Sequence, residues 1–243
     1  MTKLTITASE ELEKLVHTHI EALARQKEGL LRIGLPGGRS AKSLIKGMLG
    51  LDDACFKRIR LYLLDERRSG ELNADTLLEA GLDRAMKDNR FAKTSLHIPS
   101  IGKPLLETEN EQLDLVYLGV GEDEHVASLF PGSYPSQDKD QTALVEHSPK
   151  PPNERITFTY SGFLEHAHKA PIYLLFLGEG KREALNRLLG NMEKADSLPC
   201  SFFSQQDFFV TIITDLQEQR YEKNHHTVRR DRGPCPEETL PCL

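Results

Sequence analysis

The chain has 243 residues, and its 31 lysine and arginine residues stand against 37 aspartate and glutamate residues, which gives a formal net charge of −6. Hydrophobic residues at 38% and charged residues at 28% are typical of a globular protein with a sizeable core, which argues against wholesale disorder. The acidic balance argues against nucleic acid as the main partner, because binding to a phosphate backbone needs a basic surface.

The N-terminal fifth of the chain predicts a helix, a buried strand and a second helix. Apolar residues recur at helical spacing over Ser9–Arg25, and Thr7 with Glu10 fits a capping box that would begin this helix. Residues 30–34 form a short apolar run that ends at a Pro-Gly-Gly turn, which is typical of a buried strand. The next helix is expected over Ser40–Met48.

The same unit of strand and helix recurs along the rest of the chain. Further helices are expected over Thr76–Met86, after a cap at Ser161, and from Lys181 to Leu189. Strands are expected over five more runs: Ile59–Leu64, Leu113–Leu118, Ile156–Tyr160, Ile172–Leu177 and Phe208–Thr214. Strands that alternate with helices predict a mainly parallel sheet covered by helices on both faces. In such sheets, ligands bind at the carboxyl ends of the strands.

Two segments depart from this pattern. Ser133–Asn153 is rich in proline, serine and other polar residues, and we expect a long loop over the sheet edge or the active face. Residues 221–243 show little apolar periodicity, so we expect an irregular C-terminal tail. Nothing in the composition demands a second domain, and residues 1–220 are therefore expected to form one α/β domain.

The sequence also bears on the cellular compartment. The N-terminal residues lack the apolar centre of a signal peptide, and no run approaches the roughly 18 apolar residues of a membrane span. The four cysteines are scattered without a Cys-x-x-Cys pair, as reduced thiols usually are: Cys55, Cys200, Cys235 and Cys242. We expect a cytoplasmic protein without a membrane partner.

The first candidate site is the glycine-rich turn between the first buried strand and its helix. Gly37 and Gly38 would let the backbone approach a ligand, and the helix that follows offers free N–H groups to an anion. Arg39 and Ser40 could add a charge and a hydroxyl group. Phosphate binding and a plain connection are both open. A Walker A loop is excluded because no Gly-Lys-Ser/Thr follows, and nucleotide cofactors are disfavoured.

Charged residues follow two other expected strands. Asp65 could act as a base or orient one, and Arg67 could grip a phosphate, although a solvated turn would explain both. His125 follows a run of acidic residues that includes Asp123. A histidine there is suited to taking a proton from water, and a neighbouring carboxylate would fix its tautomer. The alternatives are an exposed histidine beside a helix cap and a zinc site, for which no ligand spacing is present.

Two further cations lie near strand ends. Arg155 opens an expected strand, and Lys181 begins an expected helix. Most lysine and arginine side chains are merely exposed, but this placement makes both candidates for a phosphate clamp.

Taken together, these segments resemble the 6-phosphogluconolactonase family. The resemblance runs from the first helix to about the last strand, and its most specific part is the stretch from Leu118 to Pro131, which contains His-Val-Ala-Ser-Leu-Phe-Pro. Four shorter pieces match in order: Gly37-Gly38-Arg39-Ser40, Asp65-Glu66-Arg67, Arg155-Ile156-Thr157 and Gly180-Lys181. The resemblance implies a three-layer α/β/α sandwich with a Rossmann-like sheet, shared with glucosamine-6-phosphate deaminases and ribose-5-phosphate isomerases.

The resemblance also implies an activity: hydrolysis of 6-phosphoglucono-δ-lactone to 6-phosphogluconate in the pentose phosphate pathway, without a cofactor or catalytic metal. With this activity, the resemblance implies that His125 takes a proton from water and that Asp123 or Asp65 supports the imidazole. Backbone N–H groups of the glycine loops stabilise the oxyanion. The 6-phosphate is held by a set of cations and backbone groups: Gly37, Gly38, Arg39, Ser40, Arg67, Arg155 and Lys181.

Three departures from the family pattern bear on the site. Glu124 replaces the usual glycine before the histidine, which at positive φ would cost on the order of 1 kcal/mol and would add a carboxylate beside the base. Ser69-Gly70 replaces a Val-Pro, and Thr76-Leu77 replaces a Ser-Asn. Two rival functions remain: an amino-sugar phosphate deaminase/isomerase, and an inactive sugar-phosphate-binding protein. The expected assembly is a monomer or small homo-oligomer.

Overall fold

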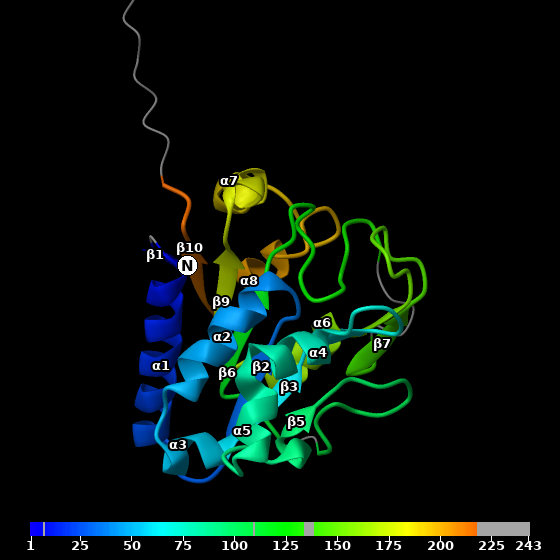
Figure 1. The fold of residues 1–243 in the computed structure, drawn as a ribbon. Coiled ribbons are helices and arrows are strands. Elements are labelled where there is room, and N and C mark those ends of the chain that lie inside the picture. The colour runs from blue at the N-terminus through cyan, green and yellow to red at the C-terminus, as the bar shows by residue number, and fades with distance from the viewer. Residues whose placement is uncertain (7, 109, 134–138, 218–243) are drawn as a thin grey trace, which may run out of the picture.

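A parallel sheet forms the centre of the molecule (Figure 1). The structure, a computed structural model, describes residues 1–217 apart from residues 7, 109 and 134–138. Within these residues, seven parallel strands lie in the following order: β1 (Thr2–Thr5), β10 (Phe209–Thr214), β9 (Pro171–Phe176), β6 (Leu115–Gly119), β2 (Leu31–Leu35), β3 (Ile59–Leu63) and β5 (Leu96–His97). The expected strands within this sheet are confirmed to within a few residues, and β1 and β5 are additions that the sequence pattern did not predict.

Helices cover both faces of the sheet. One core cluster packs beneath α1 (Ser9–Gln26), α2 (Arg39–Leu49), α3 (Asp53–Arg58), α4 (Asn73–Leu77) and α5 (Asp83–Lys87). The other packs beneath α6 (Tyr160–His166), α7 (Arg182–Gly190) and α8 (Ser201–Gln205). Strand β6 serves both clusters because successive side chains point to opposite faces: Leu115 and Tyr117 join the first, and Val116 and Leu118 join the second. The predicted α/β/α sandwich is confirmed.

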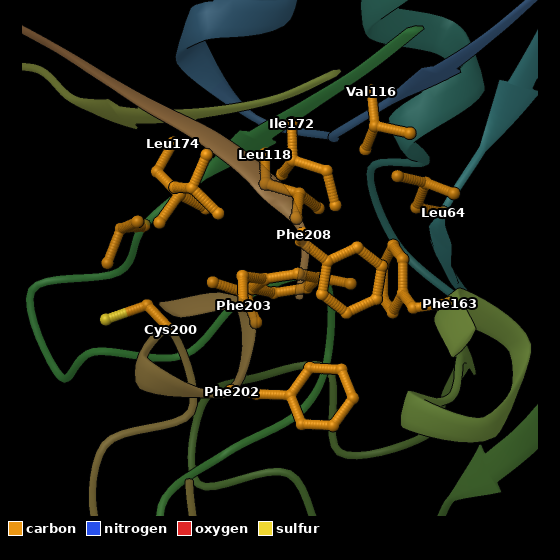
Figure 2. Packing of buried hydrophobic residues seen from close by; sticks show 14 of the residues in the cluster. Leu64, Val116, Leu118, Phe163, Ile172, Leu174, Cys200, Phe202, Phe203 and Phe208 are labelled. Atoms are coloured by element: carbon orange, nitrogen blue, oxygen red, sulfur yellow. The ribbon is translucent and has the colours of Figure 1, made fainter. Parts of the chain in front are cut away.

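Aromatic residues fill the core on the α6–α8 face. Phe203 is fully buried, and its ring meets the ring of Phe163 edge to face with centroids 4.9 Å apart. Figure 2 shows these rings, with Phe208, beside strand residues such as Leu118 and Ile172. Because large buried rings contribute much of the apolar area removed from water, this cluster anchors α6 and α8 to the sheet.

A second, antiparallel sheet corrects two expectations. The run expected as a strand of the main series, 156–160, forms β8 (Arg155–Phe158), which pairs with β4 (Asp65–Arg67) and β7 (Thr142–Val145). Asp65–Arg67 is therefore a strand and no turn, and the segment expected as a long loop contains β7. Charged residues in a three-residue strand give no alternating pattern, and β4 becomes a strand by pairing with β8.

Two helices differ from expectation in their details. The expected helix over 76–86 begins at Asn73 and is kinked within Leu78–Leu82, where Gly81 has a non-helical φ of 121°. A Cβ at Gly81 would lie 2.6 Å from a methyl group of Leu49 in α2. The absence of a side chain at Gly81 therefore lets this helical segment approach α2. Thr159, and not Ser161, caps α6 by accepting a hydrogen bond from the N–H of Gly162.

The expected capping box of α1 and the expected C-terminal tail both involve residues outside the described part of the chain. The residue before α1 is Ala8, whose side chain makes no capping hydrogen bond, and Thr7 lies outside the described residues, as do residues 221–243. The division into a domain over 1–220 and a tail stays a prediction. Among the helices that the structure describes, none is long and apolar enough to cross a membrane.

Candidate functional site

A composite cavity lies at the carboxyl ends of the central strands. Its larger part, of about 200 Å³, is lined by the turn after β2, the turn after β6 and Lys181 after β9. A smaller part, of about 100 Å³, adds residues of β4 and β8. Both parts share four residues: Gly37, Gly38, Gly119 and His125. His125 therefore lies where the two parts meet, at the edge at which parallel sheets bind ligands.

His125 forms a tightly held pair with Asp123. Its Nδ1 lies 2.6 Å from Oδ1 of Asp123, and the same oxygen accepts a hydrogen bond of 2.7 Å from Nζ of Lys150. Burial alone would raise the pKa of Asp123, but the hydrogen bonds from His125 and Lys150 lower it by more, so the pKa lies well below its usual range. With Nδ1 bonded to a carboxylate, Nε2 is the nitrogen left to accept a proton.

The turn that carries His125 depends on glycine. The N–H of Gly121 donates to the carbonyl oxygen of His125 at 2.8 Å, which closes the turn. A Cβ at Gly121 would lie 2.0 Å from Nδ1 of His125 and 2.4 Å from Oδ1 of Asp123. Any side chain at position 121 would therefore separate the histidine from its carboxylate. The ring of Phe130 packs against the imidazole with centroids 4.7 Å apart.

Asp65 occupies a different part of the site. It is buried, and its Oδ2 accepts a hydrogen bond of 2.8 Å from the hydroxyl group of Ser128. Asp65 lines the smaller part of the cavity together with Arg67 and Arg155. Of the two carboxylates expected to support the imidazole, Asp123 is the one in hydrogen-bond contact with it.

Glu66 has a structural role that the sequence did not reveal. Its carboxylate accepts hydrogen bonds from the backbone N–H groups of Arg67, Asn73 and Ala74, at 2.7–2.9 Å, and so begins α4. Burial raises the pKa of this carboxyl group above its ordinary value despite these bonds. Asn73 in turn packs on Gly37, where a Cβ would lie 2.1 Å from the amide carbon. The first glycine of the loop is therefore required by packing.

The three cations that were expected to form a phosphate clamp line the two parts of the composite cavity that meet at His125. Lys181 lines the larger part, and burial lowers the pKa of its ammonium group below the ordinary value. Arg67 and Arg155 line the smaller part. Arg155 lies over the ring of Phe130, with its guanidinium carbon 5.4 Å from the centroid. Among the described residues, none accepts a hydrogen bond from the buried Nε of Arg67, which leaves a donor for an anion that enters the cavity.

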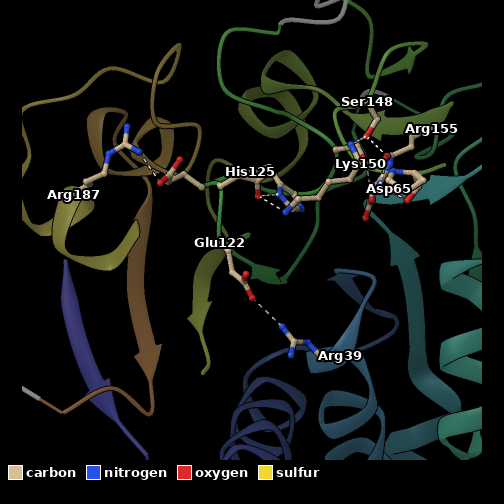
Figure 3. Close-up of polar contacts among 12 residues, drawn as sticks. Arg39, Asp65, Glu122, His125, Ser148, Lys150, Arg155 and Arg187 are labelled. Atoms are coloured by element: carbon tan, nitrogen blue, oxygen red, sulfur yellow. Dashed lines mark hydrogen bonds and ion pairs between the residues drawn. The ribbon is translucent and has the colours of Figure 1, made fainter. Parts of the chain in front are cut away.

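The glycine loop contributes a helix end. Gly38, at φ of 75°, precedes α2, which begins at Arg39, so the free N–H groups of the first helical turn face the cavity. Ser40 also lines this wall. The side chain of Arg39 is 89% exposed and lies 3.5 Å from the carboxylate of Glu122 (Figure 3), so its charge is largely in solvent.

The structure corrects one expectation about Glu124. Its φ is 64°, in the region that favours glycine, as expected. Its carboxylate, however, does not lie beside the imidazole: Oε1 is 2.6 Å from a guanidinium nitrogen of Arg187 in α7. In the view of Figure 3, Arg187 and Lys150 lie on opposite sides of His125. The sequence could not indicate this partner, which is 63 positions further along the chain.

Two residues of the site were missed by sequence reasoning: Lys150 and Ser128. Lys150 lies in the segment predicted as a loop over the active face, next to a pair of prolines, and that placement was the only available signal. Ser128 belongs to the stretch that carried the family resemblance. Over the described ranges of the chain, no three His, Cys, Asp or Glu side chains gather as a metal-ligand set.

Several curated proteins are similar to this chain. It is 44% identical over 142 residues to 6-phosphogluconolactonase 3, chloroplastic, of Arabidopsis thaliana, an alignment that covers 57% of this chain and 39% of the relative. It is 29% identical over 189 residues to a putative 6-phosphogluconolactonase of Caenorhabditis elegans, with 69% of each chain covered. The chain spans about a third of the length of its rice relatives, which are named probable 6-phosphogluconolactonase 3, chloroplastic.

Solved structures share the fold. The crystal structure of 6-phosphogluconolactonase from Thermotoga maritima superposes with a TM-score of 0.69 at 22% identity, over 87% of this chain and 97% of that one. The enzyme of the same name from Trypanosoma brucei gives 0.64 at 18% identity, over 88% and 95%. The sequence model of the family described as glucosamine-6-phosphate isomerases/6-phosphogluconolactonase matches residues 6–212. The chain therefore belongs to the family of glucosamine-6-phosphate isomerases and 6-phosphogluconolactonases.

Proposed function

We propose that this chain hydrolyses 6-phospho-D-glucono-1,5-lactone to 6-phospho-D-gluconate. The observation that carries the proposal is the pairing of His125 with Asp123 at the junction of a cavity lined by four cationic side chains. A base and an anion site within one cavity suit an uncharged ester that carries a distant phosphate. Family membership and the names of the relatives in Arabidopsis and Caenorhabditis support the same activity.

In the proposed reaction, His125 acts as a general base. Its Nε2 takes a proton from water while the water oxygen attacks C1 of the lactone, which gives a tetrahedral oxyanion. The C1–O5 bond then breaks, and the imidazolium returns its proton to the ring oxygen, so that a carboxylic acid and a hydroxyl group result. Asp123 holds the imidazole through Nδ1 and stabilises the imidazolium. Backbone N–H groups of the glycine turns stabilise the oxyanion.

The phosphate group is assigned to the cations and the helix end. Lys181 and the α2 N-terminus, preceded by Gly37 and Gly38, supply charge and N–H donors in the larger part of the cavity. Arg67 and Arg155 supply guanidinium donors in the smaller part. Holding the phosphate far from C1 positions the lactone against the base, so binding energy at one end accelerates reaction at the other.

A cytoplasmic location and a monomeric or small homo-oligomeric state remain part of the proposal. Within the part of the chain that the structure describes, Cys55 and Cys200 are buried and form no disulfide, which suits a reducing compartment. Plant relatives are named chloroplastic, and a fluorescent fusion in the source cell would distinguish an organelle from the cytoplasm. Size-exclusion chromatography with light scattering would measure the assembly.

The activity is tested by adding the purified protein to fresh 6-phosphogluconolactone and following its decay above the spontaneous rate. The proposal expects a large enzyme-dependent increase. A parallel reaction with glucosamine 6-phosphate, followed by ammonia release, tests the deaminase reaction of the same family. Ammonia release without lactone hydrolysis would replace the proposal, and binding of 6-phosphogluconate without either turnover would make the chain a sugar-phosphate-binding protein.

A further inference from the structure

Glu124 combines an unfavourable backbone conformation with a partly buried ion pair. It directly precedes His125, and its φ of 64° lies in the left-handed region, where a residue with a Cβ is strained. Its side chain is 10% exposed, and its carboxylate lies 2.6 Å from Arg187, whose side chain is 30% exposed. A glycine would adopt the same backbone without strain, so the ion pair is the contact that the glutamate adds at this position.

Arg187 is itself fixed from the other side. Its Nε and one terminal nitrogen donate to the two carboxylate oxygens of Glu193, at 2.7 and 2.6 Å. The same terminal nitrogen also donates to the carbonyl oxygen of Ser197 at 3.2 Å. A guanidinium group held by this fork has little rotational freedom left, so it can transmit position from α7 to its partner Glu124.

The same two segments also meet at a second point. Lys181 directly precedes α7, and its neighbour Gly180 packs so closely on Glu122 that a Cβ would lie 2.8 Å from the carboxyl carbon. The turn that carries His125 is thus joined to the segment that carries Lys181 twice, through Glu122 and through Glu124. Two separate points of attachment fix the relative position of two segments, whereas one point would act as a pivot.

We propose that Glu124 is a positioning residue, which through Arg187 fixes the distance between the base His125 and the phosphate-binding Lys181. This inference rests on the proposed lactonase function. A substrate anchored by its phosphate reaches the base correctly only if that distance is held. By holding this distance, Glu124 lets the energy of phosphate binding lower the barrier of the chemical step, although Glu124 itself does not contact the substrate.

Two substitutions test the proposal. Glu124→Gln keeps the shape of the side chain and removes its charge, and Glu124→Gly removes the side chain and also relieves the backbone, so that misfolding is not a concern in the second variant. Both are expected to lower kcat about tenfold, as a small misplacement of reacting groups does, with KM nearly unchanged. Glu179→Gln is the matched control, because it breaks an exposed ion pair with Arg182 near the start of α7 without reaching the His125 turn.

The decisive readout is a double-mutant cycle with Lys181→Ala. Lys181→Ala alone is expected to raise KM and also to lower kcat, because the phosphate no longer anchors the substrate against the base. If Glu124 acts through the distance to Lys181, then Glu124→Gln lowers kcat in the native background and has no further effect once Lys181 is absent. An equal loss in both backgrounds, or no loss in either, would overturn the inference while the lactonase function stood. A native protein without lactone turnover would overturn the proposed function and this inference together.

Discussion

Replacing Lys150 by methionine is expected to lower the free energy of unfolding by about 1 kcal/mol at neutral pH, because Asp123 loses one of its two hydrogen-bond partners. Nζ of Lys150 lies 2.7 Å from Oδ1 of Asp123. Attraction between unit charges at that distance is about 1.5 kcal/mol in water and about 6 kcal/mol at an effective dielectric constant of 20.

The lower part of that range applies to this pair. The side chain of Lys150 is 44% exposed and that of Asp123 is 32% exposed, so solvent screens the attraction to about 1 kcal/mol. The hydrogen bonds from His125 and Lys150 lower the pKa of Asp123, so this stabilisation is present at pH values above 3.8, the ordinary pKa of an aspartate, and is lost as the pH falls below that value. Methionine retains the aliphatic stem, so packing changes little.

The assay is urea denaturation of the native protein and of Lys150→Met at neutral pH and at pH values below 3.8. Lys169→Met is the matched control, because Lys169 is exposed and precedes β9 at the opposite end of the sheet. A Lys150→Met protein as stable as the native one at neutral pH, or a loss of the same size below pH 3.8, would contradict the stabilising role of the contact between Lys150 and Asp123.

Three further substitutions follow from the packing and the charges. Gly121→Ala is expected to lower kcat at least about 100-fold while far-UV circular dichroism is unchanged, because its Cβ would displace the imidazole; near-native activity would contradict this. Asp123→Asn is expected to lower the free energy of unfolding by about 1 kcal/mol at neutral pH. Because the pKa of Asp123 is depressed in the folded state, its carboxylate stabilises the fold at pH values above 3.8, the ordinary pKa of an aspartate. In urea titrations, the difference in unfolding free energy between the native protein and Asp123→Asn should therefore narrow as the pH falls below 3.8, and a constant difference would contradict this prediction. Phe203→Ala is expected to lower the free energy of unfolding by about 3–5 kcal/mol, since it empties a fully buried ring position, and a urea titration that shows a loss below about 1 kcal/mol would contradict this.

The main sheet could be predicted because its strands are buried on both faces. β9 is a continuous apolar run, and β2 is an apolar run interrupted only by Arg32 and Gly34. Both are bounded by glycine or proline, and such runs give a strong local signal. β4 gave none, since its three charged residues become a strand only by pairing with β8 from a segment about 90 positions later. Its carboxylates therefore read as a turn, although Glu66 is a buried cap for α4.

The candidate site could be predicted only where its contacts are local in the sequence. His125 and Asp123 are two positions apart, so their contact is local and could be inferred from the chain itself. Lys150 and Arg187 come from distant segments, and nothing in the spacing of charges connects them to this turn. The direction of the Glu124 side chain depends on the left-handed backbone at that residue, which sends it away from the imidazole and towards α7.

The most direct test of the central claim is the lactonase turnover of His125→Ala beside its affinity for 6-phosphogluconate, measured by isothermal titration calorimetry. Exposed His147→Ala provides the matched control. We expect His125→Ala to lose about 10²–10⁴-fold in kcat, which is the contribution of a general base, and still to bind 6-phosphogluconate. His147→Ala is expected to stay fully active. Native turnover in His125→Ala would contradict the assignment of His125 as the base.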